Sequence, residues 1–203
     1  MSRPFADISF TPHVQAAQER YGSRAQMSRL QSSGETGFTG LTEAEASFLG
    51  ARDGFYQATV SETGWPYVQF RGGPAGFLRV LDEKTIGYAD FRGNRQYLSV
   101  GNMTGNDRVA LILMDYASRR RLKLWARAEI LHHEDAPEVL ERLQLPDYRA
   151  RVERAVVLRV EATDWNCPQH ITPRFTEADI DAAVAPLRDR LRYLETRLAE
   201  LEV

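Results

Sequence analysis

The chain has 203 residues, of which 43% are hydrophobic, enough to bury one core and to carry appended helices. Its formal net charge of −2 gives no overall attraction to nucleic acid, and no apolar run is long enough to cross a bilayer. The single cysteine, Cys167, excludes an internal disulfide framework, and the first residues lack a secretory signal, so we expect a cytoplasmic protein.

Residues 1–40 are predicted to form a helical extension. Thr11 and Pro12 offer an N-cap and a first-turn proline for a helix that runs to about Met27. A connector rich in serine, glycine and threonine follows this helix. We expect the extension to pack on another part of the protein.

Residues 41–175 are predicted to form the main domain. Thr42 and Glu45 have the spacing of a capping box, which predicts a short helix to about Ala51. Apolar and polar residues then alternate, as is typical of half-buried strands. The predicted strands are 54–60, 65–71, 76–81, 85–90, 107–115, 120–131 and 154–163, with helices at 94–102 and 135–143. Six or seven short strands with interposed helices indicate a mainly antiparallel, closed or nearly closed barrel.

Residues 176–203 are predicted to form a heptad helix that starts at Thr176 as its cap. Apolar residues recur at alternating spacings of four and three, which places them at the a and d positions of a coiled coil. They are Ile180, Val184, Leu187, Leu191, Leu194, Leu198 and Leu201. Pro186 removes one hydrogen bond and costs about 3 kcal/mol unless the helix kinks or restarts there. The alternative is an amphipathic helix that lies on its own domain.

The segment 64–103 contains the best candidate for a binding site. A predicted strand runs into Arg92, Gly93, Asn94 and Arg95 and then into a helix start. This order gathers guanidinium groups, a side-chain amide and free backbone N–H groups, which together hold a phosphate dianion. The clustering outweighs the simpler interpretation that these arginines are solvated surface charges.

The same segment resembles the flavin-binding region of the pyridoxamine 5'-phosphate oxidase family, the FMN-binding split barrels. The resemblance covers about Leu41 to Thr163 and rests on GWPYVQFRGGPAGF followed by YADFRGNRQY. It implies a mainly β (α+β) fold, a six- to seven-stranded antiparallel FMN-binding split barrel. The flanking helices and the long C-terminal helix are added to this barrel.

FMN needs a flat apolar slot, hydrogen bonds to the ring edges and positive charge at its phosphate end. The predicted phosphate contacts are Asn94, Arg95 and Gln96, with Arg92 as an outer candidate. Two polar residues of a neighbouring strand, Gln69 and Arg71, can reach the ring carbonyls or the phosphate. The predicted ring contacts are the strand backbone around Phe77 and Leu78 and the edge at Tyr88 and Ala89. The resemblance implies the same positions and adds Gly76. The resemblance implies one further contact near Arg121.

Two departures from the family argue against vitamin B6 oxidation. Leu78 stands where the family has a substrate-binding lysine, and Arg79 is predicted to point to the opposite face of the strand. The family's arginine-bearing C-terminal segment gives way to the heptad helix. We expect the protein to bind FMN despite these two departures, but they leave the identity of the substrate open.

The remaining conspicuous residues receive structural interpretations. Aromatic residues at strand spacing are predicted to fill the barrel core: Trp65, Tyr67, Phe70 and Phe77. No metal site is predicted, since Cys167 and His170 supply two ligands where a closed zinc site needs four. Trp165 and Asn166 are candidates for touching a flavin across a dimer interface.

Three classes of function follow. The first is an FMN-dependent oxidoreductase that acts as a homodimer through its barrel and its C-terminal helix, with a small-molecule substrate and with the deazaflavin F420 as an alternative cofactor. No catalytic residue is named, because the flavin itself accepts the hydride. The second class is a non-enzymatic flavin or haem binder or redox sensor, and the third is a structural oligomerisation module. Neither nucleic acid nor a membrane is an expected partner.

Overall fold

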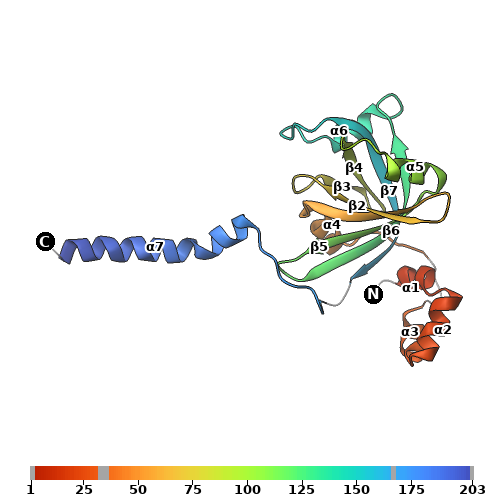
Figure 1. The fold of residues 1–203 in the computed structure, drawn as a ribbon, viewed down its shortest axis with the longest axis horizontal. Coiled ribbons are helices and arrows are strands. Elements are labelled where there is room, and N and C mark those ends of the chain that lie inside the picture. The colour runs from red at the N-terminus through yellow and green to blue at the C-terminus, as the bar shows by residue number, and fades with distance from the viewer. Residues whose placement is uncertain (1–2, 32–36, 166–167, 202–203) are drawn as a thin grey trace.

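The centre of the molecule is one antiparallel sheet of seven strands (Figure 1), seen in a computed structural model that describes residues 3–31, 37–165 and 168–201. The strands lie in the order β2-β1-β5-β6-β7-β4-β3. Their bounds are β1 Gly54–Val60, β2 Pro66–Gly72, β3 Leu78–Asp82, β4 Thr85–Phe91, β5 Arg108–Asp115, β6 Arg120–Leu131 and β7 Val152–Trp165. The predicted strands are therefore confirmed to within two residues at each end.

Alternation along the strands sends every second side chain into the barrel. On β6, Leu122 and Leu124 are fully buried, whereas Lys123 between them faces outward. The inward residues of the other strands join them in one hydrophobic core, which includes Phe55, Leu111, Leu113, Val156 and Leu158. Burying each such leucine contributes roughly 1.5–3 kcal/mol, so the alternation fixes which face of every strand lies inside.

The barrel is split, because β2 and β3 end the sheet on either side and pair with one neighbour each. Side chains bridge this seam. Arg71 on β2 donates to Asp90 on β4 over 2.6 Å, and Ser99 on α5 (Leu98–Gly105) donates to Gln69 over 2.9 Å. The predicted split barrel is thereby confirmed, and polar groups line its open side.

The N-terminal extension contains several short helices where one was predicted. They are α1 Arg3–Ser9, α2 Pro12–Arg20, α3 Arg24–Met27 and the 3-10 turn η1 Ser28–Leu30. The predicted helix to residue 27 is wrong because the chain turns at Gly22, whose φ of 77° no right-handed helix contains. The α1 helix packs on the barrel, where the rings of Phe5 and Trp125 lie 5.1 Å apart.

Two further short helices flank the barrel. The capping box of α4, Glu43–Gly50, is confirmed, because the Thr42 hydroxyl accepts the Glu45 N–H at 3.3 Å and the Glu45 carboxylate accepts the Thr42 N–H at 2.8 Å. The predicted helix at 135–143 is α6, Pro137–Leu143, which buries Leu140 and Leu143 against the barrel. Both helices thus begin where their sequence signals place them.

The C-terminal helix α7, Glu177–Leu201, projects away from the barrel (Figure 1). The Thr176 hydroxyl accepts the Asp179 N–H at 3.1 Å, which confirms the predicted cap. Helix α7 continues through Pro186, and the leucines of its seam are exposed, from 47% for Leu194 to 76% for Leu201. The alternative of a helix lying on its own domain is therefore wrong. None of the helices in the described ranges, α7 included, combines the length and apolarity needed to span a membrane.

Two aromatic residues that were predicted in the core lie on the surface. Trp65 is 76% exposed just before β2, and Phe70 is 58% exposed on that strand. The physical reason is that β2 is an edge strand, and its outward face is not covered by any described segment. The prediction is confirmed for Phe77, which is buried and stacks on Phe55 with ring centroids 5.6 Å apart.

Candidate functional site

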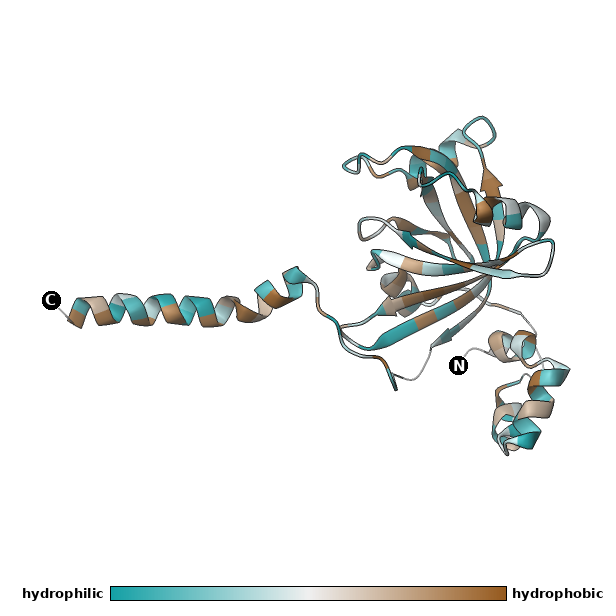
Figure 2. Ribbon diagram, in the orientation of Figure 1, coloured by the Kyte–Doolittle hydropathy of each residue, from teal (hydrophilic) through white to brown (hydrophobic). Residues whose placement is uncertain are grey.

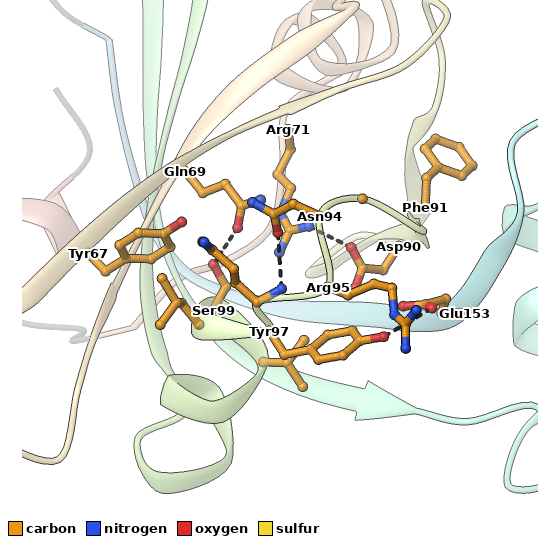
Figure 3. A pocket seen from close by; sticks show the side chains of 14 residues that line it. Tyr67, Gln69, Arg71, Asp90, Phe91, Asn94, Arg95, Tyr97, Ser99 and Glu153 are labelled. Carbon is orange, nitrogen blue, oxygen red and sulfur yellow. Dashed lines mark hydrogen bonds and ion pairs between the residues drawn. The ribbon is translucent and has the colours of Figure 1, made fainter.

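A small polar pocket opens at the seam of the barrel (Figure 3). Its walls are the inner face of β2, the end of β4, the loop 92–97, the first turn of α5, and Glu153 from β7. The cavity has a volume of about 60 Å³. It brings together the predicted contacts Gln69, Arg71, Asn94, Arg95 and Gln96.

The loop before α5 corrects one prediction. The helix expected at 94–102 begins only at Leu98, because Arg95 and Tyr97 have positive φ values of 65° and 54°. Asn94 accepts the backbone N–H of Gln96 at 3.1 Å and so closes a turn. The guanidinium of Arg95 therefore extends from a turn at the mouth of the pocket and not from a helix. Gly93 and Asn94, both turn-forming residues, are the sequence signal for this break.

The start of α5 offers further donors to the pocket. Leu98, Ser99 and Val100 form its first turn and line the cavity. The preceding residue, Tyr97, makes no side-chain capping bond, so the first N–H groups of α5 are not satisfied by a cap. Such a helix start favours an anion, since its N–H groups and its dipole both point at the ligand.

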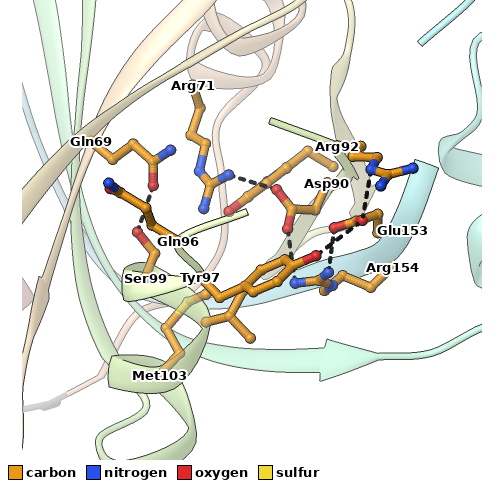
Figure 4. Close-up of polar contacts among 12 residues, drawn as sticks. Gln69, Arg71, Asp90, Arg92, Gln96, Tyr97, Ser99, Met103, Glu153 and Arg154 are labelled. Atoms are coloured by element: carbon orange, nitrogen blue, oxygen red, sulfur yellow. Dashed lines mark hydrogen bonds and ion pairs between the residues drawn. The ribbon is translucent and has the colours of Figure 1, made fainter. Parts of the chain in front are cut away.

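A network of arginines and carboxylates extends from the pocket wall, where Arg71, Asp90 and Glu153 line the cavity, to residues outside the lining (Figure 4). Asp90 lies 2.6 Å from the guanidinium of Arg71 and 3.5 Å from that of Arg154. Arg154 also donates to Glu153 over 2.6 Å, and Arg92 approaches Glu153 at 3.8 Å. Together with Arg95, the network has four guanidinium groups and two carboxylates, so it carries net positive charge although the whole chain is weakly acidic. The surplus comes from Arg92 and Arg154, which stand outside the pocket lining.

Burial has the largest effect on the ionisation of Asp90. Burial raises the pKa of its carboxyl group above the ordinary value, whereas the positive charges of Arg71 and Arg154 lower that pKa. The Nε atoms of Arg71 and Arg154 are buried and have no hydrogen-bond partner among the described residues. Buried donors without an acceptor are costly in a folded protein. Arg71, which lines the pocket, the guanidinium of Arg95, which is unpaired in the described chain, and the uncapped helix start together fit an anionic group with several acceptor oxygens.

Sequence reasoning missed Asp90, Glu153 and Arg154. The available signal was weak. Asp90 follows Tyr88 by two residues in a strand and therefore shares its inward face, and Arg154 directly precedes the apolar run of residues 155–158. A charged residue on an inward face needs a partner, but the sequence does not say which strand supplies it.

The predicted ring contacts lie outside the pocket lining. The side chains of four of them are buried in the barrel: Phe77, Leu78, Tyr88 and Ala89. Gly76 stands in the turn before β3 with a φ of 85°. Any contact of the four buried residues with a ligand would have to use their backbone atoms, so these assignments stay predictions.

Tyr88 has a well-defined structural partner. Its hydroxyl donates to Gln57 over 2.7 Å, and the amide of Gln57 donates to the sulfur of Met103 over 3.3 Å. Burial raises the pKa of Tyr88 above its ordinary value of 10.0. The hydroxyl is therefore neutral and serves as a donor inside the barrel.

Other predicted positions lie elsewhere. Arg79 donates to the carbonyl of Gln144 over 3.3 Å, on the face opposite the buried Leu78, as predicted. Arg121 is the second residue of β6, stands opposite Met114 and does not line the pocket. Trp165 packs edge-on against Phe48 at 4.9 Å. Asn166 and Cys167 lie outside the described residues, and within those residues no group of three or more His, Cys, Asp or Glu is arranged to hold a metal ion.

The family is established by comparison with known proteins. The family model for pyridoxamine 5'-phosphate oxidase matches residues 41–166, more than half of the chain, so the protein belongs to this family. The match begins just before α4 and ends with β7, and therefore covers the whole barrel but neither the N-terminal extension nor α7. No curated protein matches the chain.

Several solved structures are similar in fold. A pyridoxamine 5'-phosphate oxidase-type protein from Lactobacillus delbrueckii has 24% identity and a TM-score of 0.49, over 63% of this chain and 95% of its own. HupZ of Group A Streptococcus has 17% identity and a TM-score of 0.47, over 66% and 99%. An FMN-binding protein from Syntrophomonas wolfei has 12% identity and a TM-score of 0.45, over 59% and 81%. These values are too low to transfer a ligand or an activity.

Proposed function

We propose that this protein binds FMN, with the phosphate in the pocket at the seam, and acts as an FMN-dependent oxidoreductase in which two copies share the flavin. The observation that carries this proposal is the surplus of arginine donors around the cavity. Arg95 makes no ion pair within the described chain, and Arg71 keeps a buried Nε without an acceptor. A phosphate supplies several charged oxygens to such donors at once.

The size of the cavity supports a shared site. Pockets that enclose a cofactor usually measure about 300–1,000 Å³, whereas this one measures about 60 Å³. A single chain therefore has room for the phosphate end of FMN but not for its ring. The ring needs a second wall, and a second copy of the chain is the partner that we propose.

An apolar surface on the face of β2 opposite the pocket supports pairing of two copies. We call it the outer sheet face, and it is formed by Tyr56 on β1, Val68 and Phe70 on β2, and Ile112 on β5, which are between 39% and 59% exposed. Their strands pair so that Tyr56 stands opposite both Phe70 and Ile112, which makes the four residues one patch. Contiguous exposed apolar patches of this kind mark interaction surfaces.

Bound FMN supplies the capacity to accept and donate a hydride or single electrons. The chain's own residues would bind and orient it. Arg95 and the α5 N–H groups would hold the phosphate, and Arg71, which is paired with Asp90, would add a further positive charge beside it. Gln69, fixed by the Ser99 hydroxyl, presents its amide at the mouth of the pocket. We assign no catalytic residue.

Replacing Val68 by aspartate is expected to lower the FMN affinity by on the order of tenfold or more. An unpaired carboxylate in the outer sheet face opposes burial of that face against a second barrel, and the ring then loses its second wall. The measurement is a fluorescence titration with FMN. Val80→Asp places the same charge on β3, at the opposite edge of the sheet and also at an exposed valine, and should leave the affinity unchanged. Equal effects of both variants would argue against the outer sheet face.

The proposal as a whole is tested by reconstitution. The purified protein, incubated with FMN and passed through a desalting column, is expected to keep the visible absorbance of flavin. With reduced nicotinamide and oxygen, the bound flavin should be reduced and reoxidised much faster than free FMN. Binding without faster turnover would favour the carrier or sensor, and retention of F420 or haem in place of FMN would identify a different cofactor. A protein that keeps none of them would contradict the proposal.

A further inference from the structure

The seam of α7 is not covered by any other described part of the chain. Its apolar residues lie along one side of the helix, and in Figure 2 hydrophobic positions recur along its full length. Six of the seven are large residues more than 45% exposed: Ile180, Leu187, Leu191, Leu194, Leu198 and Leu201. Helix propensity alone contributes little to the stability of an isolated helix. Burial of this seam against a partner would stabilise α7.

The charges of α7 select the kind of partner. The helix carries six carboxylates and four arginines, so it lacks the excess of basic residues by which an amphipathic helix binds an anionic membrane. With Val184, Leu191 and Leu198 at a, the flanking g positions hold Ala183, Arg190 and Arg197, and the e positions hold Asp181, Arg188 and Glu195. Opposite charges at g and e are the signature of self-pairing between helices.

The same charges select the orientation. In a parallel, in-register pair each g residue faces the e residue of the following heptad on the other helix, so Arg190 faces Glu195 of the partner subunit. This attraction occurs twice because of the two-fold symmetry. In an antiparallel pair g faces g, and Arg190 and Arg197 would then meet arginines. Pro186 falls at a c position, away from the contact, which explains how the seam tolerates it.

We propose that α7 forms a parallel, in-register, two-stranded coiled coil with α7 of a second copy. The linker before the helix contacts the barrel, since the guanidinium of Arg174 lies 4.9 Å from the ring centroid of Tyr116, whose pKa the neighbouring Tyr56 of the outer sheet face raises. The coil therefore starts beside that face and holds two barrels at high effective concentration, whether or not a cofactor is bound. The proposal does not depend on FMN.

Cysteine cross-linking in the full chain tests the orientation. In a Cys167→Ser background, Leu191→Cys places two thiols side by side at a parallel a layer, and oxidation is expected to give a covalent dimer. Ala199→Cys, at an outward b position, is the control and should not cross-link. The proposal is overturned if Leu191→Cys fails to cross-link, or if it does so only when mixed with a Leu194→Cys chain, which is the antiparallel result. Adding Val68→Asp should leave the cross-link intact, which separates this proposal from the one on flavin binding.

Charge reversal gives a second test by sedimentation equilibrium. Arg190→Glu and Glu195→Arg are each expected to weaken self-association by on the order of two- to tenfold, and the double variant should restore it. The barrels are identical in all variants, so differences report on α7. Tighter association of Arg190→Glu would show that arginines meet at g, and a wild-type chain that sediments as a monomer of 23.1 kDa would refute the coil altogether.

Discussion

Replacing Arg95 by alanine is expected to weaken FMN binding by roughly ten- to a hundredfold. The guanidinium stands exposed on a turn at the pocket, without an ion pair in the described chain, so a phosphate would be its principal partner. Losing a hydrogen bond to a charged group costs about 1.5–3 kcal/mol. The fold should be unaffected, because the Arg95 side chain supports no other described residue. Fluorescence titration gives the affinity, and thermal melting of the cofactor-free chain gives the stability.

Arg79→Ala is the matched control. Arg79 is likewise an arginine near the surface, where it bonds a single carbonyl, but it lies on β3 and faces away from the pocket. Its loss removes the same overall charge without touching the site, so the affinity for FMN should stay within about twofold of the original value. Equal losses of FMN affinity in both variants would show that Arg95 acts only through long-range electrostatic attraction. An unchanged affinity in Arg95→Ala would show that the phosphate is held elsewhere.

The strands could be predicted because burial of one face imposes a period of two. A slip of one residue would turn Leu122 and Leu124 outward and Lys123 inward, so the sequence contains the register as well as the strand. The same rule failed for Trp65 and Phe70. Alternation of apolar and polar residues indicates that the two faces of a strand differ. It does not indicate that β2 lies at the edge of the sheet, where its outward face is not covered by another described segment. That information comes from strand order, which is a long-range property.

The residues of the candidate site also fall into two groups: those that local sequence predicts and those that depend on strand pairing. Asn94, Arg95 and Gln96 could be found because they are contiguous and follow a strand. Asp90 and Arg154 are 64 positions apart and meet only because β4 pairs with β7, where these two residues stand directly opposite each other. No local pattern in the sequence contains that pairing. The loop side of the pocket was therefore predictable from one segment, and the carboxylates that pair with Arg71 and Arg154 were not.

The second large expected effect concerns Tyr88, where the structure favours a role in the core over contact with a ligand. Tyr88→Ala is expected to lower the free energy of unfolding by about 3–5 kcal/mol, the usual cost of removing a buried aromatic ring. Its side chain is 1% exposed and meets Phe55 edge-on with ring centroids 5.3 Å apart. Tyr88→Phe keeps the ring but leaves the Gln57 oxygen without its donor, which costs about 1–3 kcal/mol. Urea unfolding measures the free energy of unfolding of both variants. The control is Tyr21→Phe, at a side chain that is 78% exposed, and it should change this free energy by less than about 0.5 kcal/mol.

The ionisation of Tyr88 gives this prediction a pH dependence. Because burial raises the pKa of the folded-state hydroxyl above 10.0, folding is favoured while the group is protonated. That contribution is fully present below pH 10 and is lost as the pH rises from there toward the folded-state pKa. Wild-type stability should therefore fall more steeply above pH 10 than that of Tyr88→Phe, so the difference between them narrows. If Tyr88→Phe instead kept its full stability and lost FMN affinity, the hydroxyl would be a ligand contact, and the barrel interior would have to open toward the flavin.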